Sequence, residues 1–285
     1  MTGSSNSSWA FTERQSMTSI KLADGTLDVI ETGSGKPLVL LHSLLADRSV
    51  FDRVVPMLAR DRRVILPDLP GFGGSPSAGA TIEAVADRIG GLFDALDLQN
   101  ADILGNGFGG FVASTLAIRH GDRFDRLVLA DTGVTFTEAG RASFHVMAAR
   151  VREHGMEGVV DIAMKRLFPE DYLAANPEVL AERRSALLKT NPDFFADACA
   201  ALAGLDLTAN IGAIRNPTLV VVGSVDAATP PPMAHELARS IEGSELVELA
   251  GLGHAPMAQA PDVFVDAIAG FLGLARAEQP SRARA

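Results

Sequence analysis

Short apolar runs alternate with longer amphipathic stretches through most of this chain. Continuous apolar runs such as residues 37–42 and 218–222 are typical of strands that are covered on both faces of a sheet. Similar runs occupy residues 63–66, 101–104, 126–130 and 246–249, and helical patterns lie between most of them at 49–60, 82–98, 108–119, 232–241 and 261–274. Strands that alternate with helices predict an α/β fold, with a mostly parallel sheet and helices on both of its faces.

Two segments depart from this alternation. Residues 19–31 contain two alternating runs around Asp24-Gly25, which predicts a hairpin and therefore an antiparallel edge to the sheet. Residues 134–210 contain no convincing strand and carry helical spacing, so we expect a helical insertion between two strands. At the carboxyl edge of a parallel sheet, such an insertion would cover the site expected there.

These patterns suggest a division of the chain into a core, an insertion and two ends. The expected parts are a flexible lead-in at 1–16, a core at 17–133 and 211–275, a helical lid at 134–210, and a tail at 276–285. Aromatic and methionine side chains of the insertion are interpreted mainly as packing between its helices, at Phe136, Phe144, Met147, Met164, Phe168, Phe194 and Phe195.

Composition and charge restrict the classes of partner. The 285 residues are 47% hydrophobic, which allows a sizeable core, and the net charge of -10 argues against nucleic acid or an anionic membrane as partner. The single cysteine, Cys199, excludes an internal disulfide and provides no metal framework. No run approaches the length of a membrane span, and the first residues lack the pattern of a secretory signal, so a cytoplasmic location is expected.

The most informative stretch is a glycine-rich turn. Residues 105–110 read Gly-Asn-Gly-Phe-Gly-Gly and follow an apolar run, so they predict a strand, a sharp turn and the start of a helix. Four further landmarks also stand at strand ends: His42-Ser43-Leu44, the loop 68–75, the loop Gly223-Ser-Val-Asp226 followed by two prolines, and Gly251-Leu-Gly-His254.

These five landmarks, in this order, resemble the α/β-hydrolase superfamily over about residues 19–274. The turn at 105–110 corresponds to the nucleophile elbow G-x-S-x-G, but Gly107 stands where that motif has its serine. The resemblance implies a mostly parallel, eight-stranded-type sheet with a helical lid. His42-Ser43 and the overall size are similar to the enol-lactonase and C–C bond hydrolase groups, whereas haloalkane dehalogenases would need a carboxylate at position 107.

The resemblance also implies roles for single residues. His254 would be the general base, and Asp226 would be the carboxylate that orients it. Asp131, directly after the run 126–130, is a rival for that acid, and motif context favours Asp226. The backbone N–H groups of Leu44 and Phe108 would form an oxyanion hole.

Position 107 leaves the nucleophile open. The elbow residue is held at positive φ, which strains a serine by about 1–2 kcal/mol, whereas glycine adopts that conformation without a steric penalty. Ser43 is the only hydroxyl near the oxyanion loop and is a candidate stand-in, but it lies on another strand and is therefore disfavoured. Three readings stay open: a natural variant that works through His254 and its acid, an engineered hydrolase without its serine, and a binding protein that has lost catalysis.

The expected activity is hydrolysis of a small uncharged or anionic ester, lactone or 1,3-dicarbonyl-like compound. The alternative is a catalytically silent protein that binds a small ligand in the same pocket. Neither cofactor nor metal is implied, and the expected partner is a small-molecule substrate, with a homodimer left open.

Overall fold

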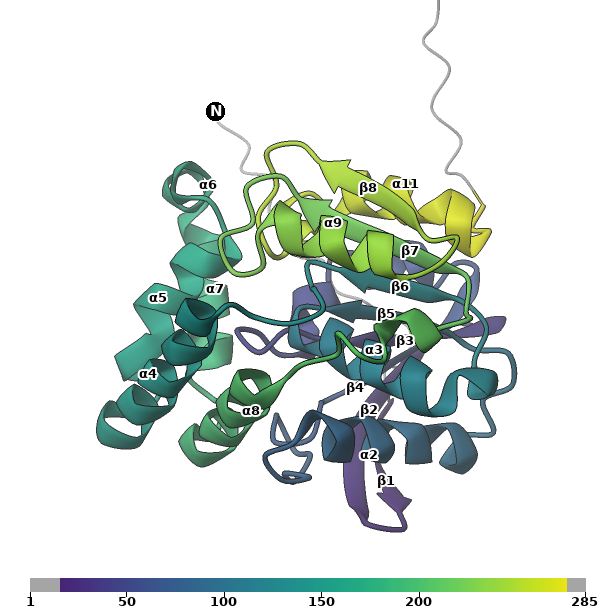
Figure 1. The fold of residues 1–285 in the computed structure, drawn as a ribbon, viewed down its shortest axis with the longest axis horizontal. Helices are drawn as coiled ribbons and strands as arrows, with labels where there is room; N and C mark the ends of the chain where they lie inside the picture. The colour runs from purple at the N-terminus through teal and green to yellow at the C-terminus, as the bar shows by residue number, and fades with distance from the viewer. Residues whose placement is uncertain (1–15, 276–285) are drawn as a thin grey trace, which may run out of the picture.

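The computed structural model describes residues 16–275, and a twisted eight-stranded sheet forms its centre (Figure 1). The strand order is β1-β2-β4-β3-β5-β6-β7-β8. The strands are β1 (Ser16–Leu22), β2 (Gly25–Thr32), β3 (Lys36–Leu41), β4 (Arg62–Pro67), β5 (Asp102–Asn106), β6 (Leu127–Ala130), β7 (Thr218–Gly223) and β8 (Glu245–Leu249). The predicted hairpin and antiparallel edge are confirmed, because β2 pairs antiparallel with both β1 and β4 while every later pair is parallel.

The two predicted chain ends fall mostly outside these residues. The lead-in at 1–16 and the tail at 276–285 lie outside the described residues, except that Ser16 already begins β1. Within the described part of the chain, no helix is long and apolar enough to cross a membrane.

Helices cover both faces of the sheet, as the alternating pattern predicts. On one face lie α2 (Ile82–Ala95), α3 (Phe108–His120) and α9 (Pro231–Ser240), which stand in front of the strands in Figure 1. On the other face lie α1 (Val55–Leu58) and α11 (Pro261–Leu272), with α10 (Pro256–Gln259) between β8 and α11. Short 3-10 turns occupy η1 (Arg48–Phe51), η2 (Gly121–Arg123) and η3 (Ile211–Ala213).

The single helix expected at 49–60 is wrong, because the structure divides this stretch into η1 and α1. The side chain of Asp47 accepts a hydrogen bond from the Ser49 N–H and so starts a tight first turn. Pro56 has no N–H with which to continue a helix from that turn, and it stands in the first turn of α1, where a missing N–H costs nothing. The apolar residues of the stretch are buried all the same, which is why the pattern resembled one helix.

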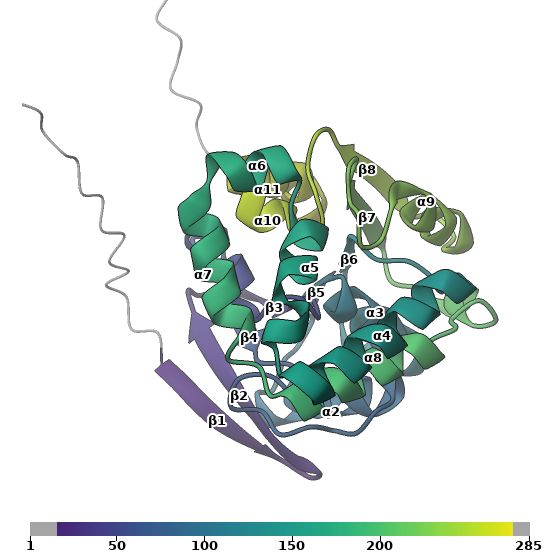
Figure 2. The ribbon, with the colours of Figure 1, turned by 90° about the vertical axis from the view of Figure 1, so that its left-hand side faces the viewer.

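Five helices occupy the insertion between β6 and β7. They are α4 (Glu138–His154), α5 (Glu157–Leu167), α6 (Glu170–Ala175), α7 (Pro177–Leu187) and α8 (Pro192–Gly204). Figure 2 shows them as a layer that crosses one end of the sheet. The two ends of the insertion meet in an antiparallel bridge between Thr135 and Asp206, so the segment leaves and re-enters the core at one point.

Candidate active site

A sharp turn joins β5 to α3 at the carboxyl edge of the sheet. Gly107 has φ 53° and ψ -114°, a conformation that suits glycine and strains other residues. Its N–H donates to the Ala130 carbonyl at 3.0 Å, which ties the turn to the neighbouring strand. A β-carbon at Gly105 would collide with the backbone of Gly109, so the two outer glycines permit close packing of strand and helix. The positive φ expected at position 107 is therefore present.

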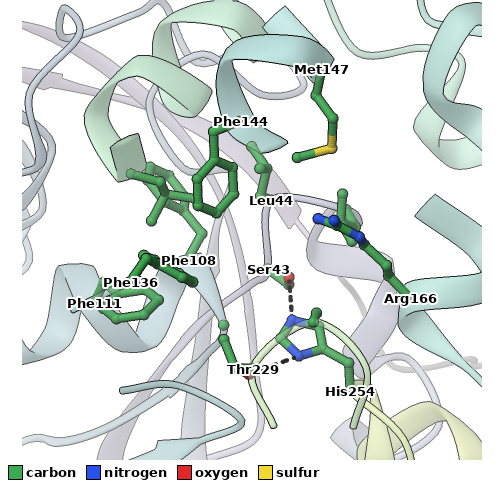
Figure 3. Close-up of a pocket in the computed structure, with 14 residues that line it drawn as sticks. Ser43, Leu44, Phe108, Phe111, Phe136, Phe144, Met147, Arg166, Thr229 and His254 are labelled. Carbon is green, nitrogen blue, oxygen red and sulfur yellow. Dashed lines mark hydrogen bonds between the residues drawn. The ribbon is translucent and has the colours of Figure 1, made fainter. Parts of the chain in front are cut away.

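The missing side chain at Gly107 leaves room that two other residues use. A β-carbon built there would lie 2.6 Å from Nε2 of His254 and 2.7 Å from Oγ of Ser43. Both distances are shorter than ordinary van der Waals contact, which begins near 3.5 Å. His254 and Ser43 therefore extend into the space that a side chain at position 107 would occupy. Figure 3 shows these two side chains pointing toward each other.

His254 follows β8 and is held by Asp226, which follows β7. Nδ1 of His254 lies 2.9 Å from Oδ2 of Asp226, and both side chains are buried. The other oxygen of Asp226 accepts hydrogen bonds from the N–H groups of Ala228 (2.7 Å) and Thr229 (3.1 Å). Burial alone would raise the pKa of Asp226, but the charge of His254 and the hydrogen bonds from His254 and Thr229 lower it. Asp226 is thus an ionised acceptor that holds Nδ1 protonated.

Asp131, the rival acid, occupies a different place. It accepts hydrogen bonds from the Gly223 N–H at 2.9 Å and from the Asn106 side-chain amide at 3.3 Å. Within residues 16–275, no hydrogen bond joins it to His254. Burial, together with the nearby charge of Asp226, raises the pKa of Asp131 well above its usual range. The pKa values of the two carboxyls therefore shift in opposite directions, and of the two only Asp226 contacts the histidine ring.

Ser43 contacts His254 although it lies on a different strand from the elbow, which was the reason to disfavour it. Its Oγ lies 3.0 Å from Nε2 of His254, on the side of the ring opposite Asp226. Ser43 follows β3, which pairs with β5, and His254 follows β8, which pairs with β7. The loops after these parallel strands converge at the carboxyl edge of the sheet. Sequence separation concealed this proximity.

His42 joins the loops after β3 and β4 through hydrogen bonds, a structural role that the sequence did not indicate. The Leu69 N–H donates to Nε2 of His42 at 3.1 Å, so that nitrogen is an acceptor and Nδ1 carries the proton. Nδ1 then donates to the Ser43 carbonyl at 3.0 Å. Burial lowers the pKa of His42, which is consistent with this neutral ring. The only sequence signal for this role is the position of His42 at the end of β3, directly before Ser43.

The N–H groups of Leu44 and Phe108 are both free to face a ligand. The Ser43 carbonyl also accepts from the Ala46 N–H at 3.3 Å, and a trans peptide directs the Leu44 N–H to the opposite side. Phe108 is the first residue of α3, where N–H groups lack intrahelical acceptors. Among the described residues, neither group has a hydrogen-bond acceptor.

These residues line one pocket at the carboxyl edge of the sheet. Its walls are mostly apolar, and the insertion contributes Phe136, Phe144 and Met147 (Figure 3). Met164, Phe168 and Phe195 do not line it and belong to the hydrophobic core, and Phe194 lies beside Gly71 instead. Arg166 of α5 also lines the pocket, and it makes no hydrogen bond or ion pair with another described residue.

Metal binding finds no support at this site. Across residues 16–275, histidine, cysteine and carboxylate side chains form no group of three or more that could hold a metal ion. The remaining helical histidines lie away from the pocket; for example, His120 and His235 face carboxylates at the surface.

Comparisons with known proteins agree with this architecture. The model of the "Alpha/beta hydrolase family" matches residues 38–267. The enol-lactonase from Burkholderia xenovorans LB400 is similar in structure, with a TM-score of 0.85 and 29% identity, covering 90% of this chain and all of that one. A thermophilic esterase from Thermogutta terrifontis, solved with malate bound, has a TM-score of 0.83 and 31% identity, covering 90% of this chain and 98% of its own.

A third relative matches over a shorter stretch. The 2-hydroxymuconate semialdehyde hydrolase of Pseudomonas sp. (strain CF600) is 41% identical over 113 residues, which is 37% of this chain and 40% of that protein. The family match, in contrast, spans every element of the site from β3 to α11. The chain therefore belongs to the alpha/beta hydrolase family of enzymes.

Proposed function

We propose that this protein hydrolyses a small ester, lactone or 1,3-dicarbonyl-like compound with a His254–Asp226 dyad. The observation that carries the proposal is the 2.9 Å contact between the two side chains beside a pocket with two free N–H groups. A protein that only binds a ligand has no need of a buried acid–base pair. The relatives named as enol-lactonase, esterase and semialdehyde hydrolase support this substrate range.

The proposed roles follow from the hydrogen bonds. Asp226 accepts the Nδ1 proton of His254, which leaves Nε2 unprotonated and able to act as general base toward the pocket. When a nucleophile attacks the substrate carbonyl, negative charge develops on its oxygen. The N–H groups of Leu44 and Phe108 then stabilise that oxygen. Position 107 supplies no nucleophile, because glycine has no side chain.

Arg166 favours an anionic substrate. It belongs to the insertion, which we propose acts as the lid, and its guanidinium points toward the pocket beside Ser43 and His254 (Figure 3). Its walls are otherwise largely apolar, so an unpaired guanidinium would bind a substrate carboxylate with little competition from water. The related esterase with malate bound is consistent with an anionic ligand.

His254→Ala tests the proposal against loss of catalysis. We expect kcat/KM for p-nitrophenyl acetate and for a small enol-lactone to fall by about 10³-fold or more, since the general base is removed. His235→Ala is the matched control, because His235 is a surface histidine on α9 that pairs with Glu248. Turnover that survives His254→Ala at the rate of the control would refute the dyad, and ligand binding without turnover in the unsubstituted protein would support the binding alternative.

Arg166→Met tests the substrate class separately. Methionine keeps much of the length of the side chain and removes its charge. We expect kcat/KM for a carboxylate-bearing ester to fall by about 10- to 100-fold, the loss of one charge-assisted hydrogen bond of about 1.5–3 kcal/mol. The matching methyl ester, which lacks the carboxylate, should change by less than about threefold. Equal losses for both substrates would contradict the carboxylate contact.

A further inference from the structure

We propose that Ser43, in the loop after β3, is the nucleophile of this site in place of the residue at the elbow. This inference rests on the proposed hydrolase function and adds the group that attacks the substrate. The substrate's acyl group would then be held covalently on a residue outside the elbow motif, and water would attack only in the second step.

The position of Ser43 follows from the register of the sheet. Leu41 of β3 pairs with Gly105 of β5, so the residues two places further along, Ser43 and Gly107, leave adjacent strands side by side. Ser43 Oγ lies 2.7 Å from the point where a β-carbon at position 107 would stand. A hydroxyl is therefore presented close to the place from which an elbow serine would act.

The contacts of Ser43 form a complete relay. Oγ of Ser43 is 3.0 Å from Nε2 of His254, and Nδ1 of the same ring is 2.9 Å from Asp226. Nucleophile, base and orienting acid are thus joined in series at hydrogen-bond distance, which is the arrangement that activates a serine. Nε2 has no other hydrogen-bond partner among the described residues.

Glycine at position 107 and serine at position 43 are linked by the space they share. A β-carbon at 107 would press on both Ser43 Oγ and His254 Nε2, so the contact between these two atoms depends on the glycine. Without a side chain at 107, the ring of His254, which follows β8, can reach Ser43, which follows β3. The lack of a side chain at position 107 is therefore what permits the contact between Ser43 and His254.

The oxyanion donors suit attack from either strand. At an elbow, the residue after the nucleophile supplies one N–H, and that residue is Phe108. Leu44 stands in the same relation to Ser43. Leu44 and Phe108 both line the same pocket, and neither N–H has an acceptor among the described residues. Nδ1 of His42 donates a hydrogen bond to the Ser43 carbonyl, which holds the backbone of the proposed nucleophile in place.

The reaction balances without any further reagent than water. Ser43 Oγ bonds to the carbonyl carbon while its proton passes to His254 Nε2. The ester or lactone C–O bond breaks, the leaving oxygen takes that proton, and the acyl group remains on Ser43. Water then loses a proton to Nε2, attacks the acyl carbon and releases the acid, after which His254 returns the proton to Ser43.

A small alkyl fluorophosphonate and a chromogenic ester test this assignment. We expect the reagent to label the protein at Ser43, located by mass spectrometry of the fragment that contains it, and p-nitrophenyl acetate to give a burst of nitrophenolate. Ser43→Ala should abolish label and burst and lower kcat/KM by about 10³-fold or more. Ser34→Ala is the matched control, because Ser34 is exposed on the same stretch of chain and should keep both.

Ser43→Cys supplies a readout that does not depend on turnover. His254 should activate the thiol at position 43, so iodoacetamide should alkylate it at least about tenfold faster than in the Ser43→Cys, His254→Ala double variant. Cys199 contributes little, since burial raises the pKa of its thiol to about 12. Equal alkylation rates in the two variants would overturn the pairing.

The outcomes separate this inference from the function beneath it. If His254→Ala abolishes turnover while Ser43→Ala keeps a rate within about tenfold of the unsubstituted protein, Ser43 is not the nucleophile and water attacks directly. A label on any residue other than Ser43 overturns the assignment as well. If neither substitution changes turnover, the proposed hydrolase dyad itself fails.

Discussion

Gly107→Ala adds a single carbon at the most crowded point of the site. The new β-carbon would stand 2.6 Å from His254 Nε2 and 2.7 Å from Ser43 Oγ. Ordinary contact begins near 3.5 Å, so the two tips must each retreat by roughly 0.8–0.9 Å. Such a displacement would lengthen the 3.0 Å hydrogen bond between them beyond a useful distance.

Two separable effects follow from Gly107→Ala. The backbone at φ 53° and ψ -114° strains any residue with a β-carbon, which costs on the order of 1–3 kcal/mol. For a domain of this size, a loss of about 2 kcal/mol lowers Tm by roughly 4–8 °C. Displacement of the reacting groups by about 1 Å should lower kcat/KM for p-nitrophenyl acetate by about 10²-fold.

Urea unfolding and steady-state ester hydrolysis measure the two effects independently. Gly270→Ala is the matched control: Gly270 lies exposed in α11 with open space around it, so alanine should raise stability by about 0.5–1 kcal/mol and leave turnover unchanged. Gly107→Ser carries the same strain as Gly107→Ala but adds a hydroxyl beside His254. An unfolding free energy for Gly107→Ala equal to that of the unsubstituted protein, with full turnover, would refute the reasoning on both counts.

Three further variants probe the groups around the dyad. Thr229→Val removes the hydroxyl that lies 2.7 Å from Asp226 Oδ2. We expect kcat to fall five- to tenfold, which corresponds to about 1–1.4 kcal/mol, and the pH–rate profile to show a raised pKa for Asp226. An unchanged profile would count against that contact. Burial lowers the pKa of His42, so stability should fall as pH drops below about 6.5 through its folded pKa, and urea unfolding of His42→Gln should show a smaller loss on acidification. The pKa of Asp131 is raised, so its contribution is present at low pH and lost as pH rises through the folded pKa; Asp131→Asn should flatten that decline, and an identical pH dependence would contradict a protonated Asp131.

The sequence was sufficient for the parts of the site that depend on strand ends. His254 and Asp226 each follow an apolar run and a glycine, and the resemblance to the hydrolase superfamily, carried by five such landmarks in order, is what assigns them their roles. Parallel strands then bring their carboxyl ends to one edge, which is where the structure has both residues in contact.

Other parts depend on register and on packing between distant segments. The sequence places Ser43 on a different strand from the elbow and so disfavours it, yet the pairing of Leu41 with Gly105 brings it beside Gly107. That register cannot be derived from either strand by itself. The position of Arg166 at the pocket likewise depends on how α5 packs across the sheet edge, and the helical pattern of one segment does not indicate which face meets which neighbour.

The bridge between Thr135 and Asp206 has a consequence for how such proteins diversify. Because both ends of the 134–210 segment meet at one point of the core, a segment of different length or sequence can replace it while the pairing of the strands stays the same. The proposed catalytic groups belong to the sheet loops, whereas Phe136, Phe144, Met147 and Arg166 belong to the 134–210 segment. Grafting the corresponding segment of a related esterase onto this core would therefore transplant selectivity for the acyl group without disturbing the acid–base pair.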